Sequence, residues 1–177
     1  STLHNTLFPY TTLFRSLAAL GNPGAWIQRV QASSLQPGLI FIAVAASKAG
    51  FVTNFFVGRS EDNGETWSWS DNLGPGRDRA VGFELSDHDV NRLWVGMGTA
   101  GSEKSRILVS NNGGRTFSAL HEFDTWWNPS DIYVPDVDNP DDSKLYASVD
   151  GPAGTQLMYF RDAGASWVNI TAEGKAI

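Results

Sequence analysis

One eight-residue pattern occurs three times in this chain, and its copies are evenly spaced. The copies read SEDNGETW at residues 60–67, SNNGGRTF at 110–117 and FRDAGASW at 160–167. Their closing aromatic residues stand at positions 67, 117 and 167, which is 50 residues apart each time. A fixed period of this length is the signature of a repeat architecture, in which each repeat is one supersecondary unit stacked on the next.

Each repeat also contains four short runs of β-branched and aromatic residues, bounded by Gly, Asn, Asp and Pro. This pattern is typical of strands joined by tight turns, and no window shows a capped helical periodicity. The expected first three strands of the repeats cover residues 26–32, 39–45 and 51–59, then 80–85, 93–97 and 105–110, then 131–135, 145–149 and 156–161. The fourth strands are expected to begin at Thr66, Thr116 and Ser166, directly after the motif.

Four strands in each repeat correspond to one blade of a β-propeller. The predicted fold class is therefore all-β: a partial β-propeller of about three four-stranded antiparallel blades. Propellers usually carry about four to eight blades around a central channel. We therefore expect a fragment of a larger propeller, whose open faces are covered by missing blades of the same chain or by self-association.

The first sixteen residues, STLHNTLFPYTTLFRS, match nothing in the repeats and contain no Asp or Glu. They lack the basic start of a signal peptide, because Arg15 follows the apolar stretch instead of preceding it. Residues 7–16 resemble a translated sequencing-adapter artefact, so residues 1–16 are expected to be a non-native leader. The three blades are then predicted at residues 17–79, 80–130 and 131–177.

Composition excludes several classes of function. The net charge is −6 and the 13 basic residues are scattered, which argues against a nucleic-acid partner. The absence of cysteine excludes disulfides and thiolate metal sites. No run of 18 apolar residues occurs, so the sequence predicts no membrane span.

The motif closely resembles the Asp-box, also called the bacterial neuraminidase repeat. That repeat occurs in sialidases, xyloglucan-active glycoside hydrolases, sortilin-type receptors and photosystem II assembly factors, and the resemblance covers about 160 of the 177 residues. An Asx side chain can close a turn on backbone amides, and glycine supplies a position of positive φ. We therefore expect the motif residues to have a structural role and not a catalytic one. They are Ser60, Asp62, Gly64, Thr66 and Trp67, then Ser110, Asn112, Gly114, Thr116 and Phe117, then Asp162, Gly164, Ser166 and Trp167.

In a propeller the loops from each fourth strand to the next blade lie on the face opposite these turns. The richest of these loops is predicted over residues 121–130 and contains Asp124, Trp126 and Trp127. Aromatic faces stack on sugar rings and carboxylates bind hydroxyl groups, so this loop is a candidate carbohydrate site. The alternative is structural, with one tryptophan packed between blades and the other capping the core.

A second candidate is the segment Arg77-Asp78-Arg79, on the same predicted face. The resemblance to sialidases implies arginines that bind a substrate carboxylate, for which a guanidinium is well suited. The alternative is a salt-bridged or solvated turn. Tyr133 lies on a predicted innermost strand and is expected in the core. No pair of catalytic carboxylates can be assigned, so the catalytic residues stay unknown.

The remaining polar segments predict no metal or cofactor. The acidic segment 136–142 lacks the pattern of a calcium loop and is expected to be a solvated turn. His88 and His121 have no partner at a ligand spacing.

Two functions follow for such a chain. The first is a fragment of a secreted propeller, extracellular or periplasmic in a bacterium, that acts on or binds carbohydrate. If this propeller is an enzyme, it is expected to be a glycoside hydrolase of the sialidase or xyloglucanase type. The alternative is a non-enzymatic propeller that binds protein or serves in assembly, like sortilin-type receptors or photosystem assembly factors.

Overall fold

The computed structural model describes residues 25–48, 52–76, 81–98, 104–124, 127–135, 139–152 and 154–171. The expected leader, residues 1–16, lies outside these ranges. Apart from one turn of 3₁₀ helix, η1 (Asp162–Gly164), all regular structure in this part of the chain is β-strand. None of the described elements is a helix long and apolar enough to cross a bilayer.

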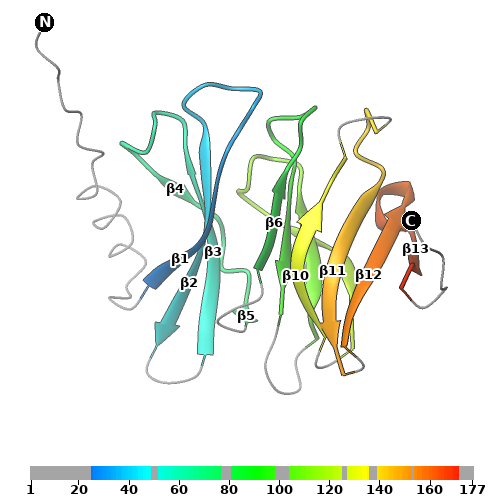
Figure 1. Cartoon of the computed structure of the whole chain (residues 1–177). Helices are drawn as coiled ribbons and strands as arrows, with labels where there is room; N and C mark the ends of the chain where they lie inside the picture. Colours follow the sequence, from blue (N-terminus) through cyan, green and yellow to red (C-terminus); the bar gives the residue numbers. More distant parts are fainter. Residues whose placement is uncertain are drawn as a thin grey trace, which may run out of the picture.

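The strands form three antiparallel sheets, and within each sheet the strands follow one another in chain order (Figure 1). The first sheet contains β1 (Ala25–Ala32), β2 (Ile40–Lys48), β3 (Val52–Ser60) and β4 (Ser68–Trp69), with β5 (Pro75–Gly76) also paired to β3. The second contains β6 (Val81–Leu85), β7 (Leu93–Met97), β8 (Arg106–Ser110) and β9 (Ser118–Glu122). The third contains β10 (Asn128–Tyr133), β11 (Leu145–Gly151), β12 (Gly154–Arg161) and β13 (Ser166–Asn169).

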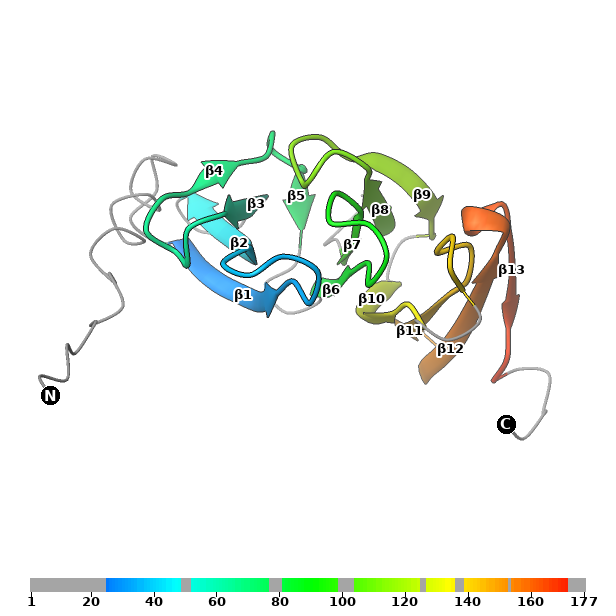
Figure 2. The ribbon, with the colours of Figure 1, turned by 90° about the horizontal axis from the view of Figure 1, so that it is seen from above.

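The three sheets stand side by side in an arc, with β1, β6 and β10 along its inner edge (Figure 2). This arrangement confirms the predicted fold class, a partial β-propeller built from four-stranded antiparallel sheets. Each strand has alternate residues on its two faces, so a sheet between two others has two apolar faces. In β7, for example, Leu93, Val95 and Met97 face the first sheet, whereas Trp94 faces the third.

Two glycines allow the second and third sheets to approach closely along the inner edge. A Cβ atom on Gly82 of β6 would lie 2.8 Å from Cγ1 of Ile132, and one on Gly96 of β7 would lie 2.9 Å from Cβ of Pro129. Such distances are too short for any side chain. The absence of a side chain at these positions therefore brings β10 against β6 and β7.

Two expectations about β10 were wrong. The strand begins at Asn128 and not at Asp131, and β9 continues to Glu122. The candidate loop predicted over residues 121–130 is therefore restricted to residues 123–127. Tyr133 is 57% exposed and not in the core. Its neighbours Ile132 and Val134 belong to the hydrophobic cluster between the second and third sheets, so the alternation of a strand puts Tyr133 on the opposite face.

The acidic segment before β11 also differs from the expected solvated turn, although residues 136–138 lie outside the described ranges. Asn139 is fully buried, and its side-chain amide donates to the carbonyl oxygens of Pro135 (3.0 Å) and Lys144 (2.9 Å). Asp142 is 3% exposed and accepts a hydrogen bond from the Ser86 hydroxyl at 2.6 Å. Asn139 and Asp142 are therefore held by protein groups, and the Asp142 bond to Ser86 links the second and third sheets. Pro140 and Asp141 between them are exposed, as expected of a solvated turn.

Candidate functional site

The motif at residues 60–67 closes its own turn. The Asp62 carboxylate accepts hydrogen bonds from the Thr66 amide (2.8 Å), the Thr66 hydroxyl (2.5 Å) and the Ser60 hydroxyl (2.8 Å). The Ser60 oxygen in turn accepts from the amide of Gly64 at 2.8 Å. The hydrogen bonds from Thr66, with a smaller contribution from Ser60, lower the pKa of Asp62 to about 2. This carboxylate is therefore committed to the turn as an anion.

The other two motif turns use the same position with different chemistry. In the second turn Asn112 accepts from the Thr116 amide (3.0 Å) and donates to the Thr116 hydroxyl (2.7 Å), which reverses the direction of the hydroxyl bond. In the third turn Asp162 accepts from the Ser166 hydroxyl at 3.1 Å, and Phe160, at the position of the first serine, is fully buried. A side chain that closes the turn is enough, whether or not it is charged.

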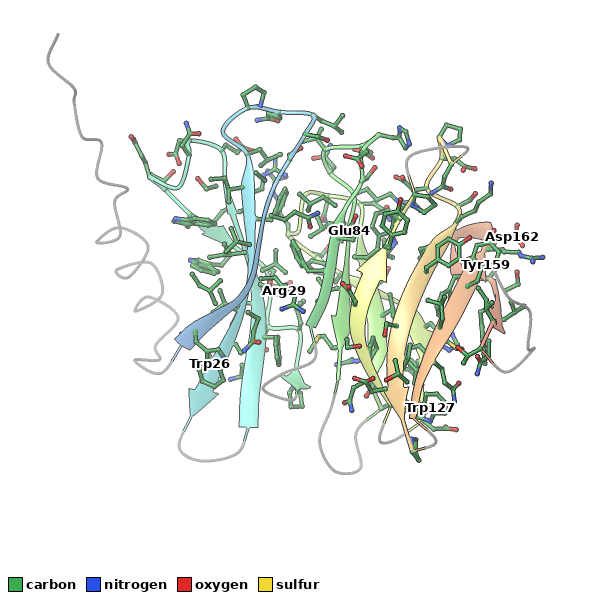
Figure 3. All side chains as sticks on the ribbon, in the orientation of Figure 1. Trp26, Arg29, Glu84, Trp127, Tyr159 and Asp162 are labelled. Carbon is green, nitrogen blue, oxygen red and sulfur yellow. The ribbon has the colours of Figure 1, made fainter. Side chains whose placement is uncertain are left out.

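The sequence-predicted ligand residues are only partly within the described structure. Arg77, Asp78, Arg79 and Trp126 lie outside the described ranges, so their proposed roles remain predictions. Asp124 and Trp127 are described, and both line the same groove. Trp127 and Asp162 lie near opposite ends of the third sheet (Figure 3). Trp127 therefore lines the end of the groove away from the motif turns, whereas Trp167, the closing aromatic of the third motif, lines it on the motif side.

The groove lies between the second and third sheets and has a volume of about 350 Å³. One wall is the end of β9 with the segment that follows it, and the other wall is formed by β12 and β13. Its lining residues are His121, Glu122, Phe123, Asp124, Trp127, Gln156, Met158, Trp167 and Asn169.

Packing holds the floor of this groove in place. Phe123 is buried, and its amide donates to the carbonyl oxygen of Ser105 at 2.8 Å. The Trp127 ring lies nearly parallel to Phe123, with ring centroids 6.4 Å apart and an interplanar angle of 17°. A Cβ atom on Gly151 would lie 2.9 Å from the Trp127 ring, so the indole rests directly on this glycine. Trp127 therefore packs on the core, as the structural alternative expected, and it also lines the groove; its role as a carbohydrate ligand stays a prediction.

Trp167 and His121 form the more exposed aromatic part of the groove. Trp167 is 47% exposed. The His121 ring lies edge-on to Trp167 and Phe160, with centroids 5.3 Å apart in each case, and 4.6 Å from the ring centroid of Phe123. Burial lowers the pKa of His121, although nearby Glu122 acts in the opposite direction. The imidazole is therefore mainly uncharged at neutral pH and is a polar member of an aromatic cluster.

The polar groups of the groove are two amides and two carboxylates. The Asn169 side-chain amide donates to the Gln156 side-chain carbonyl, which holds the two amides together. Asp124 is exposed, and Glu122 forms a partly exposed ion pair with Lys104 at 3.5 Å. Amides and carboxylates beside an exposed indole are the groups that bind sugar hydroxyls and the apolar face of a sugar ring.

Sequence reasoning missed three of these residues. Trp167 was assigned to the motif turn alone, and Gln156 and Asn169 were not singled out. His121 belonged to the candidate loop over residues 121–130, but by itself it was considered only as a metal ligand. The available signal was the two-residue period of a strand. Gln156 and Met158 alternate to one face of β12, as Trp167 and Asn169 do on β13, so a polar end of an apolar face was predictable.

A separate carboxyl group on the inner edge has an unusual protonation state. Burial, with smaller contributions from Asp87 and Asp131, raises the pKa of Glu84 to about 7, against a hydrogen bond from Gln31. The Gln31 side-chain nitrogen lies 3.4 Å from a Glu84 carboxyl oxygen. Glu84 lies on β6 at the inner edge of the arc (Figure 3). About half of this group is protonated at neutral pH, so it can donate as well as accept a hydrogen bond.

Among the residues that the structure describes, no three His, Cys, Asp or Glu side chains gather in a way that could hold a metal ion.

Comparisons with known proteins agree with the fold. No protein-family model matches the sequence, and no curated protein matches it either. Among solved structures, the chain is similar to the GH74 xyloglucanase from Xanthomonas campestris, with a TM-score of 0.62 and 16% sequence identity. The match covers 85% of this chain and 24% of that protein, so the chain spans about a quarter of the xyloglucanase. At this identity the likeness shows a shared β-propeller fold, and that neighbour is a glycoside hydrolase.

Proposed function

We propose that this chain is part of a β-propeller that binds carbohydrate, of the kind found in glycoside hydrolases that act outside the bacterial cytoplasm. The observation that carries the proposal is the groove between the second and third sheets. There the half-exposed indole of Trp167 lies beside Trp127, two amides and two carboxylates. The structural similarity to a xyloglucanase supports the same direction.

The exposure of Trp167 is not explained by an open end of the arc. The equivalent aromatic of the second motif, Phe117, packs into the cluster between the first and second sheets. Trp167 likewise faces the sheet before it, since it contacts His121 of β9. The neighbouring sheet is thus present, yet the indole remains about half exposed. An exposed aromatic in an internal groove indicates a contact surface for a ligand.

The proposal is tested by binding measurements on the 177-residue chain with a panel of soluble polysaccharides, by affinity electrophoresis and calorimetry. We expect binding to at least one glycan, and we expect Trp167→Ala to weaken it by about tenfold, equivalent to about 1.4 kcal/mol. Trp127→Ala should have a similar effect, with circular dichroism as a check on folding because Trp127 also packs on the core. Tyr133→Ala is the matched control, since Tyr133 is an exposed aromatic outside the groove.

Two results would reject the proposal. The first is a folded chain that binds none of the glycans, which would favour the alternative of a protein-binding or assembly module. The second is glycan binding that is equally strong in Trp167→Ala, Trp127→Ala and wild type, because the ligand would then occupy another surface.

A further inference from the structure

We propose that the groove between the second and third sheets selects neutral sugars over sugars that carry a carboxylate. This selectivity rests on the proposed function, because it concerns the class of sugar that the same groove would bind. It separates the two kinds of hydrolase that the motif resembles, since a sialoside is anionic whereas an unsubstituted glucan is neutral.

The charged side chains in the described lining of the groove are all of one sign. Glu122 and Asp124 line the groove, and both residues are exposed to solvent. Its described lining contains neither Lys nor Arg. Two cations lie close to Glu122 but outside the described lining. Lys104 is 3.5 Å from Glu122 and its side chain is 58% exposed. Arg106, the partner of Glu122 across β8 and β9, donates to the carbonyl oxygen of Leu73. An exposed pair such as Lys104 and Glu122 neutralises its carboxylate only weakly.

His121 does not supply the missing positive charge. Its imidazole is enclosed by Phe123, Phe160 and Trp167, and burial among these rings favours the neutral form. Nearby Glu122 favours the charged form of His121, but its effect on the pKa is smaller than that of burial. The groove therefore has a negative potential at neutral pH.

A neutral pyranose ring matches each wall of the groove. Its apolar face can lie on the exposed indole of Trp167, and its hydroxyls can bond to the amides of Gln156 and Asn169. The Asp124 and Glu122 carboxylates can accept hydrogen bonds from sugar hydroxyls, and these bonds are charge-assisted. The same two carboxylates repel a uronate or a sialic acid, and no guanidinium is present in the described lining to pair with the ligand carboxylate.

The test compares ligands that differ at one group of each sugar, which is either a neutral primary hydroxyl or a carboxylate. The probes are cellohexaose and a β-linked galactohexaose, each beside the form in which every primary hydroxyl has been oxidised to a carboxylate. Calorimetry at low salt should show that the oxidised form binds more weakly, by up to about tenfold. Added sodium chloride should reduce this difference in affinity. Asp124→Asn and Glu122→Gln should narrow it too, while Asp71→Asn, an exposed carboxylate of the first sheet, should leave it unchanged.

Each result has a distinct meaning. Preference for the neutral hexaose that is reduced by Asp124→Asn and Glu122→Gln supports the selectivity. Equal or tighter binding of the oxidised form overturns the selectivity and leaves carbohydrate binding standing. A preference that both variants leave unchanged also overturns it, because the groove carboxylates would not be its cause. Failure to bind any glycan, in this assay and in the panel, rejects the proposed function and the selectivity together.

Discussion

Glu84 provides a direct test of whether the inner edge of the arc is as desolvated as its contacts indicate. Its pKa rises from 4.5 to about 7 in the folded chain, mainly through burial. A carboxyl whose folded pKa is raised binds more protons in the folded state than in the unfolded state between these two values. The free energy of unfolding that it contributes is therefore fully present below pH 4.5 and is lost as the pH rises through about 7.

The size of the effect follows from the shift. At about 1.36 kcal/mol for each pKa unit, a shift from 4.5 to about 7 corresponds to an upper limit of about 3 kcal/mol. Glu84 is only half-buried, and water screens part of its interaction with Asp87 and Asp131. We therefore expect about 1–2 kcal/mol after discounting for this screening.

The variant Glu84→Gln should remove this dependence on pH. The amide cannot ionise, and its oxygen can still accept from Gln31. Urea unfolding followed by tryptophan fluorescence, at pH values on both sides of the window, gives the free energy of unfolding of both proteins. The difference between them should be smallest below pH 4.5. Above about pH 7 the variant should be more stable than wild type by about 1–2 kcal/mol.

The protonation of His121 also affects the free energy of unfolding, with a pH dependence of the opposite sign. Its pKa is lowered from 6.5, so the unfolded chain binds the extra proton and stability increases as the pH rises through that value. This contribution is present in wild type and in Glu84→Gln, so it cancels in the difference. Asp131→Asn, which removes one facing charge, should shrink the effect without abolishing it. Parallel profiles for wild type and Glu84→Gln would refute the reasoning, because Glu84 would then be as well solvated as in the unfolded chain.

Two further substitutions test the turn and the contact between sheets. Ser60→Ala removes a buried hydroxyl and leaves the partly buried amide of Gly64 without its acceptor, so urea unfolding should show a loss of about 1–3 kcal/mol in the free energy of unfolding. A change below the error of the measurement would contradict the role of this hydroxyl. Gly82→Ala places a methyl group 2.8 Å from Cγ1 of Ile132. The same measurement should show a loss of about 1–3 kcal/mol in the free energy of unfolding, because the contact is overpacked. An unchanged urea midpoint would show that β10 does not pack against β6 as closely as described.

Most strands could be predicted because the same succession of apolar runs and turn residues occurs in all three repeats. β7 begins and ends where its alternation of apolar residues predicts, over Leu93–Met97. β10 was placed too late because Pro129 reads as a strand breaker, whereas a register shift between Pro129 and Asp131 accommodates it in the strand. Local residue preference alone does not reveal such a shift.

Only part of the groove could be predicted, because the closing aromatic residues of the motif copies have different surroundings. In the first turn the Trp67 indole donates to the carbonyl oxygen of Gly64 at 3.0 Å and stacks with Trp69, so its surroundings are supplied by its own sheet. Trp167 has the same place in the sequence pattern, but its ring contacts are to His121 of the preceding sheet. One pattern thus fixes where the aromatic is attached, and the neighbouring sheet determines how much of it remains exposed. The motif predicts the turn because its hydrogen bonds are local, and it does not predict the site because exposure depends on residues about fifty positions away.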